Sequence, residues 1–147
     1  MSEPIGYLIT DVSRLIRREF GARARQIGVT SAQLRTLSLL KREPGCNQGQ
    51  IADILEVEPI TVGRMIDRLE EAGLVERRRD PADRRVWRIH LTDAAQPLIV
   101  QLREIGDALT EHALTGLGSA DREALDAMLA RIRTNLLTDN INEAANG

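Results

Sequence analysis

The sequence is poor in aromatic residues, with one Tyr, one Phe and one Trp among its 147 residues. Proteins that bind single-stranded nucleic acids stack the bases on aromatic side chains, so a platform of that kind is excluded. The single cysteine, Cys46, also excludes an internal disulfide and a cysteine-rich zinc site. No apolar run approaches the length of a membrane span and no signal peptide opens the chain, so we expect a cytoplasmic protein without membrane contact.

Lysine is nearly absent too: Lys41 is the single lysine, and all other Lys and Arg positions are arginine. The planar fork of arginine suits contacts with bases and phosphates, although a GC-rich genome would produce the same bias. The formal net charge of −2 does not by itself indicate nucleic-acid binding. Residues 1–90 carry 16 basic and 13 acidic side chains, whereas residues 91–147 carry 4 and 9. The net charge therefore conceals a basic middle of the chain and an acidic C-terminal part.

The basic residues concentrate in residues 76–92. Six arginines lie there: Arg77, Arg78, Arg79, Arg84, Arg85 and Arg88. Asp80 and Asp83 between them suit a reversal of the chain. Apolar and polar residues then alternate from Trp87 to Leu91, which is the period of a strand. The stretch predicts a basic β-hairpin with one buried face.

Apolar periodicity and capping signals predict a series of helices before and after the hairpin. The expected helices cover residues 5–27, 30–43, 48–55, 59–72, about 93–115 and about 119–137. Thr30 with Gln33, and Asn47 with Gln50, have the spacing of capping boxes. Residues after Asp139 are expected to fray.

The order of these elements predicts a mainly α fold with a small β wing. Residues 30–91 are expected to form a winged helix-turn-helix within a single domain of residues 1–147. The segments 1–29 and 92–147 carry more apolar surface than so small a module can cover. We expect them to form a helical dimerisation lobe, because a two-fold homodimer is the commonest way to bury such surface.

The helix over residues 59–72 is predicted to have a core face and a groove-facing face. The candidate DNA contacts on the second face are Thr61, Arg64, Met65 and Arg68. Arginine can contact guanine with two hydrogen bonds, and methionine can touch a thymine methyl group. A helix face with two arginines is ordinarily only solvated, so it is the adjacent basic hairpin that favours double-stranded DNA as the partner.

The hairpin supplies the other candidate DNA contacts, which are Arg77, Asp83, Arg84 and Arg85. Its two-stranded tip is narrow enough for a minor groove, whose negative potential attracts arginine. Asp83 would repel DNA unless it braces a neighbouring arginine. The alternative is that Asp83 is simply a turn residue.

These motifs resemble the MarR family of regulators, and within it the SlyA subgroup. The resemblance extends over most of the chain, from Ser13–Arg17 through Leu69–Leu74 to the hairpin, where Asp83-Arg84-Arg85 and the strand ending Leu91-Thr92 are its most specific part. It implies a homodimer joined through its terminal helices, binding a pseudo-palindromic operator and repressing nearby genes.

The resemblance also implies roles for particular residues. Arg85 matches an arginine that enters the minor groove with Asp83 as its brace, and Thr61 and Arg64 match recognition-helix contacts. Many members bind small aromatic acids between the two lobes, which lowers their affinity for DNA. Arg14 and Arg17 match positions near that cleft; the alternative is that both form ion pairs on the helix surface or in the dimer.

Two departures from the family pattern limit what is carried over. Leu34 stands where SlyA-like relatives have an aromatic residue. Redox-sensing relatives have a cysteine in the first helix, whereas Cys46 lies in a loop, so their mechanism does not transfer. No cofactor or metal site is expected.

Two other function classes were weighed. An enzyme is not expected, because the titratable candidates Cys46, His90 and His112 share no motif and no glycine-rich phosphate loop is present. A winged helix that binds proteins without sequence-specific DNA binding is the stronger rival, since a fold does not fix a function. That alternative would not require arginines on both the helix face and the wing tip.

Overall fold

The computed structural model describes the backbone of residues 2–146 and the side chains of residues 2–139. The chain forms two compact units, Met1–Leu109 and Thr110–Gly147. The division falls inside a helix rather than at residue 92. The expected grouping of residues 1–29 with 92–147 as a dimerisation lobe stays a prediction.

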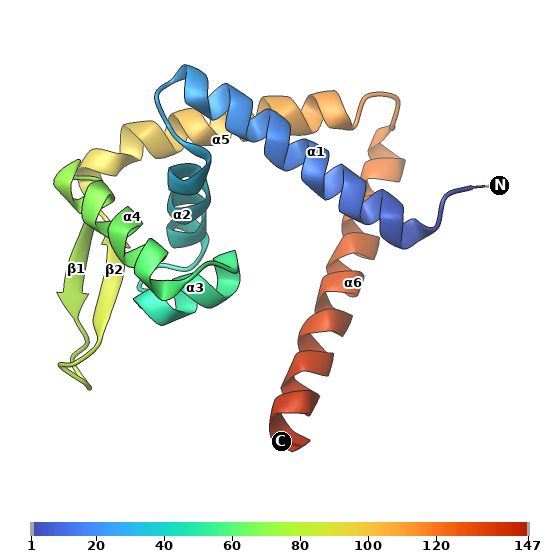
Figure 1. Cartoon of the computed structure of the whole chain (residues 1–147). Helices are drawn as coiled ribbons and strands as arrows, with labels where there is room; N and C mark the ends of the chain where they lie inside the picture. Colours follow the sequence, from blue (N-terminus) through green and yellow to red (C-terminus); the bar gives the residue numbers. More distant parts are fainter. Residues whose placement is uncertain (1, 147) are drawn as a thin grey trace. The chain divides into compact units, whose positions relative to one another are not determined.

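The first unit holds the winged helix-turn-helix (Figure 1). Its elements are α1 (Ile5–Gln26), α2 (Ser31–Arg42), α3 (Gln48–Leu55), α4 (Pro59–Glu71), β1 (Val75–Arg79), β2 (Trp87–Leu91), a short 3₁₀ helix η1 (Asp93–Ala95) and most of α5 (Gln96–Ala113). The second unit contains the end of α5 and α6 (Ser119–Asn146). The expected fold class, mainly α with a small β wing, is confirmed.

Local side-chain caps start the helices of the module where the sequence predicts them. The Thr30 hydroxyl accepts a hydrogen bond from the Gln33 N–H at 3.1 Å, and the Gln33 side chain accepts from the Thr30 N–H at 3.0 Å. Asn47 and Gln50 repeat this capping box at the start of α3. Pro59 is the first residue of α4, where its missing N–H costs no helical hydrogen bond.

The core lies between α2, α3, α4 and the base of the hairpin. Leu37 and Leu40 of α2 meet the predicted inner stripe of α4. That stripe, Val62, Ile66 and Leu69, is fully buried. Burying side chains of this size contributes about 1.5–3 kcal/mol each, which fixes the rotation of α4 and leaves its other face in solvent.

The two strands form an antiparallel hairpin that projects past α4 (Figure 1). Val75 and Ile89 at its base are buried, as strand alternation predicts. Trp87 is not, because 41 % of the residue is exposed. It lies nearer the tip, beyond the reach of the core, and its ring stacks against the Arg79 guanidinium at 4.4 Å. The prediction of one continuous buried face is therefore wrong at Trp87.

The helix boundaries after the hairpin also differ from the prediction. The expected helix over 93–115 is η1 followed by α5. Thr92, at the N-cap of η1, makes no side-chain cap; its hydroxyl donates to the Gly73 carbonyl at 2.5 Å and joins the end of β2 to the end of α4. The last helix, α6, continues to Asn146 instead of ending near residue 137.

Apolar side chains remain exposed on the first and last helices. On α1 they are Ile5, Leu8, Ile9, Val12, Leu15 and Ile16. On α6 they are Met128, Leu129, Ile132, Leu136 and Leu137. Exposed apolar stripes of this extent are typical of surfaces that pack against another chain. Of the helices that the structure describes, none is both long enough and apolar enough to cross a membrane.

Candidate nucleic-acid interface

The exposed face of α4 carries three of the four predicted groove-facing residues. Thr61, Arg64 and Arg68 are all exposed. Met65 is half-buried instead: it packs against the core, and the Thr36 hydroxyl donates to its sulfur at 3.8 Å. Met65 therefore lies partly against the module, and its predicted contact with a thymine methyl stays a prediction.

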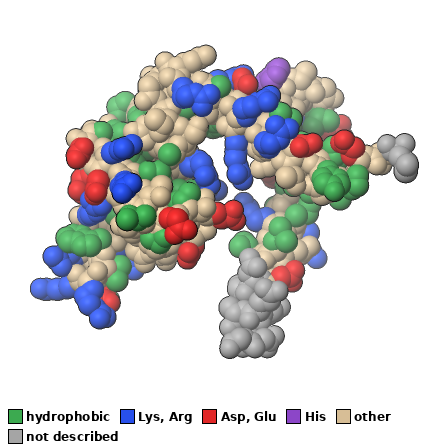
Figure 2. Space-filling view, viewed as in Figure 1, with side chains coloured by type: hydrophobic (Ala, Val, Ile, Leu, Met, Phe, Trp, Pro, Cys, Tyr) green, Lys and Arg blue, Asp and Glu red, His purple; other side chains and the backbone are tan. Residues whose placement is uncertain are grey.

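The tip of the hairpin carries Arg84 and Arg85, both exposed, and basic side chains gather there (Figure 2). Asp83 accepts hydrogen bonds from Arg85 Nε at 3.1 Å and Nη2 at 3.2 Å. These bonds hold the pKa of the Asp83 carboxyl below its usual value. Asp83 is thus an ionised partner of Arg85, the arrangement required of a brace.

Arg79 supports the same tip from β1. Its Nη1 donates to the Arg84 carbonyl at 2.8 Å while its guanidinium covers the Trp87 ring. The contact closes the loop across the hairpin and limits the motion of the backbone that carries Arg84.

Arg77, also predicted to contact DNA, is engaged elsewhere. Its Nη2 lies 2.6 Å from Asp67 and its Nη1 lies 2.9 Å from Glu70, both on α4. Only 22 % of the Arg77 side chain is exposed. These contacts join β1 to α4 and place a positive charge beside two carboxylates. The predicted DNA contact of Arg77 stays a prediction.

Arg88, on β2, is also bonded to other parts of the module, although 43 % of its side chain is exposed. Arg88 Nε donates to the buried Asp80 carboxylate at 2.6 Å, and Arg88 Nη1 donates to the Gly45 carbonyl at 3.0 Å. The backbone N–H of Ala82 and the Arg88 guanidinium together lower the pKa of Asp80. The turn of the wing is thereby bonded to the loop that precedes α3.

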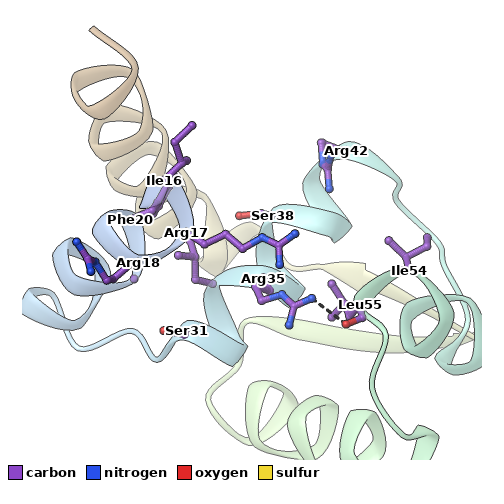
Figure 3. Close-up of a pocket in the computed structure, with 12 residues that line it drawn as sticks. Ile16, Arg17, Arg18, Phe20, Ser31, Arg35, Ser38, Arg42, Ile54 and Leu55 are labelled. Atoms are coloured by element: carbon purple, nitrogen blue, oxygen red, sulfur yellow. Dashed lines mark hydrogen bonds between the residues drawn. The ribbon is translucent and has the colours of Figure 1, made fainter. Parts of the chain in front are cut away.

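A cavity of about 520 Å³ lies between α1, α2 and α3 (Figure 3). It is lined by Ile16, Arg17, Arg18, Phe20, Gly21, Ser31, Leu34, Arg35, Ser38, Arg42, Ile54 and Leu55. Arg17 extends from α1 towards Arg35, which itself donates to the Leu55 carbonyl at 2.8 Å. Arginines over an apolar floor, with no carboxylate in the lining, give a site suited to an anion with an apolar body.

Cys46 and His90 are the other titratable groups of the module whose pKa values are shifted. Burial raises the pKa of the Cys46 thiol, with Glu43 adding to the shift, so the thiolate is disfavoured. Burial lowers the pKa of His90, and Arg78 adds to that effect. Among the side chains of residues 2–139, no three His, Cys, Asp or Glu residues gather as a metal ion would require.

Comparison with known proteins agrees with this geometry. The model of the MarR family matches residues 29–87. Apo wild-type MarR from E. coli superposes with a TM-score of 0.78 at 24 % identity, covering 90 % of this chain and 98 % of that chain. A MarR transcriptional regulator from Methanosarcina mazei Go1 gives a TM-score of 0.77 at 28 % identity, covering 91 % and 90 %. Bordetella bronchiseptica BpsR gives 0.70 at 24 % identity, covering 89 % and 99 %.

These matches show the winged-helix fold, and they show a likeness to the MarR family over residues 29–87. The Methanosarcina mazei Go1 protein is described as a MarR transcriptional regulator. The segment that the family model matches contains α4 and most of the wing, and therefore Arg64, Arg68, Arg84 and Arg85.

One exposed apolar residue of α4, Ile60, was not among the predicted contacts. The residue follows Pro59 in the first turn of α4 and is 68 % exposed, beside Thr61. An exposed apolar side chain at that position can touch a thymine methyl group, the contact predicted for Met65. The signal was present in the sequence, because residue 60 is off the core stripe that begins at Val62.

The two arginines predicted to border a ligand cleft lie in different surroundings. Arg17 lines the cavity. Arg14 does not, and its Nη2 lies 3.6 Å from Asp11 in an exposed pair one helical turn away. The two residues therefore differ in surroundings: Arg17 borders the cavity, whereas Arg14 forms an ion pair on the helix surface, and a ligand role for either stays a prediction.

Proposed function

We propose that the chain is a sequence-specific transcriptional regulator that binds duplex DNA through α4 and the wing. The observation that carries the proposal is the exposure of two arginine pairs on one module, Arg64 with Arg68 on α4 and Arg84 with Arg85 at the wing tip. The helix would enter the major groove and Arg85 the adjacent minor groove. Ile60 and Thr61 lie in the first turn of α4, where base contacts are expected.

The regulator is proposed to act as a homodimer on a pseudo-palindromic operator. The exposed apolar stripes of α1 and α6 support a dimer, because a second copy would remove both from water. Repression of nearby genes, the placement in the SlyA subgroup and a cytoplasmic location belong to the same proposal. They rest on the resemblance of the Asp83-Arg84-Arg85 motif and its following strand.

The cavity beside Arg17 is proposed to bind a small aromatic carboxylate that releases the protein from DNA. BpsR, similar in fold, is described as regulated in DNA binding by 6-hydroxynicotinic acid, an aromatic acid. In this chain the volume of about 520 Å³ suits such a molecule. Arg17 and Arg35 offer guanidinium groups for its carboxylate, and Phe20, Leu34 and Leu55 offer apolar contact for its ring.

The rival is a winged-helix module that binds another protein and has no sequence-specific DNA binding. The two functions separate in a fluorescence-anisotropy titration of random-sequence duplex DNA at low and at physiological salt. A DNA-binding regulator binds the duplex, and its affinity falls steeply as the salt concentration rises, because phosphate contacts release counterions. A module without such binding, or with binding that salt leaves unchanged, would favour the protein-interaction function.

A further inference from the structure

A series of hydrogen bonds joins the turn of the wing to the start of α4. It begins at Asp80, whose side chain is 10 % exposed. Asp80 Oδ1 accepts from the backbone N–H groups of Ala82 at 2.7 Å and Asp83 at 3.2 Å. Its other oxygen, Oδ2, accepts from Arg88 Nε at 2.6 Å. One carboxylate thus fixes both the turn and the arginine on β2.

Arg88 carries the connection from the hairpin to the loop before α3. Its Nη1 donates to the Gly45 carbonyl at 3.0 Å. The Gly45 N–H donates to the Ile89 carbonyl at 3.0 Å, and the Ile89 N–H donates to the Cys46 carbonyl at 2.9 Å. Gly45 has a φ of +82°, and a Cβ there would meet His90 Cε1 at 3.2 Å. Residues 45–47 therefore lie along β2, with an isolated bridge between Asn47 and Arg88, and the positive φ of Gly45 favours glycine there.

The same loop leads directly to α4. Asn47 caps α3 by accepting from the Gln50 N–H at 2.8 Å. The next residue, Gln48, donates from Nε2 to the Pro59 carbonyl at 2.9 Å, in the first turn of α4. A Cβ at Gly63 would lie 3.0 Å from that same Nε2, so the absence of a side chain there makes room for the contact.

We propose that Arg88 is a positioning residue for DNA recognition, holding the wing through Asp80 and Gly45 at the separation from α4 that lets both elements engage one duplex. The proposal rests on the proposed function and adds a residue that does not contact DNA. Its guanidinium is held on two sides by protein acceptors. A wing that is already held in place loses less conformational entropy when the complex forms than a mobile wing does. Its contacts with DNA therefore contribute more to the affinity.

Arg78 provides a matched control for Arg88. The two residues are register partners across the hairpin, and the Arg78 side chain is bound to Glu76 of its own strand. Arg88→Met and Arg78→Met each remove one positive charge at the same level of the wing. The charge loss therefore affects DNA attraction similarly in both variants, whereas only Arg88→Met breaks the connection to Gly45.

The probe is a duplex that the wild-type protein selects from a random-sequence library, followed by fluorescence anisotropy at several salt concentrations. Arg88→Met is expected to bind about tenfold more weakly than Arg78→Met, in the range of coupled hydrogen-bonded pairs. The slope of log affinity against log salt should be the same in Arg88→Met and Arg78→Met, because each variant loses one positive charge and neither loses a phosphate contact.

The Asp80→Asn variant distinguishes a positioning role from a charge effect, because the two predict opposite changes in DNA affinity. Removal of a negative charge beside DNA strengthens binding if electrostatics alone decide, whereas loss of the Arg88 partner weakens it. Several-fold weaker binding is expected, and Asp80→Asn/Arg88→Met should bind no more weakly than Arg88→Met alone. Thermal unfolding establishes that each variant is folded. If Arg88→Met does not fold, Arg88→Lys and Asp80→Asn carry the test, both with weakened binding expected.

The outcomes distinguish failure of the positioning role of Arg88 from failure of the proposed DNA-binding function. Equal affinities of Arg88→Met and Arg78→Met, or tighter binding by Asp80→Asn, overturn the positioning role and leave the proposed function standing. A wild-type protein that selects no sequence overturns the proposed function, and the positioning role with it.

Discussion

Asp83 holds Arg85 with both of its carboxylate oxygens, while 90 % of the Arg85 side chain remains exposed. Asp83 Oδ1 also accepts from the backbone N–H of Arg85 at 3.1 Å. One carboxylate therefore fixes the main chain and the side chain of the residue that follows the wing tip. Arg85 is exposed but already oriented, which suits it to a narrow groove.

Substitution of Arg85 should separate charge from orientation. Arg85→Ala should cost about 1–3 kcal/mol of binding free energy on a selected duplex. Arg85→Lys keeps the charge but cannot match the two oxygens of Asp83, so its binding to random duplex should hold while its preference for the selected duplex falls. Anisotropy titrations of both duplexes measure this. If Arg85→Ala binds the selected duplex as tightly as wild type at the same salt concentration, the wing does not contact DNA.

Substitution of Arg64 should change which sequence is read. Arg64→Ala should relax discrimination at one base pair in each half-site, at about 1–3 kcal/mol per contact, because a guanine contact is lost. Competition between duplexes substituted at single positions measures the effect. Arg23→Ala, which removes the same charge from α1, is the control and should keep the wild-type pattern. If Arg64→Ala instead weakens binding to all duplexes equally, Arg64 contacts a phosphate and not a base.

Arg77 should act on stability. Arg77→Ala leaves Asp67 and Glu70 without their partner and is expected to lower the free energy of unfolding by about 1 kcal/mol, as a partly buried ion-pair network. Denaturant unfolding measures the change. The control, Arg68→Ala, alters an exposed arginine of α4 and should change stability by less than about 0.5 kcal/mol. Equal effects in the two variants would show that the contacts to Asp67 and Glu70 contribute nothing beyond charge.

Arg17 and Arg14 give a matched pair for the ligand proposal. Both lie on α1 and carry the same charge, but only Arg17 lines the cavity. Salicylate at about millimolar concentration should weaken binding to a selected duplex in wild type and in Arg14→Ala, and much less in Arg17→Ala. Ionic strength and pH are held constant, since added salt alone weakens DNA binding. An unchanged response of Arg17→Ala removes Arg17 from the site, and no response in wild type removes this class of ligand.

Acid should weaken the wing through Asp80. Its pKa is lowered in the folded protein, chiefly by the N–H of Ala82 and then by Arg88, so the folded state favours the ionised carboxylate. The stability this adds is fully present above the unfolded-state pKa, near about 4, and is lost as pH falls through the lower folded-state value. Unfolding midpoints at pH 7 and in acid should therefore differ less in Asp80→Asn than in wild type. An identical decline would show that Asp80 does not contribute.

The parts of the structure that sequence reasoning predicted well are set by neighbours along the chain. The capping boxes at Thr30 and Asn47 depend on partners three residues away. The core stripe of α4 follows from helical periodicity alone. The Asp83–Arg85 pair also joins residues two apart, and the MarR-type motif singled it out.

The parts that were missed depend on contacts between distant segments. Arg77 and Arg88 are indistinguishable by composition from the exposed arginines beside them. Their roles come from Asp67, ten residues away, and from the Gly45 carbonyl, 43 residues away. Met65 shares a helical face with Arg64 and Arg68, yet it turns towards Thr36 of α2 because the apolar contact lies there. Such partners follow from packing, which periodicity along one helix does not contain.

The selection of duplexes from a random-sequence library by the wild-type protein tests the central claim most directly. The account predicts an enriched two-fold symmetric motif whose half-site centres lie about one DNA turn apart, roughly 34 Å. It also predicts two chains on each selected duplex and an affinity that falls steeply with salt. A library that yields no enriched motif, bound weakly and without dependence on salt, would contradict a DNA-reading role for α4 and the wing.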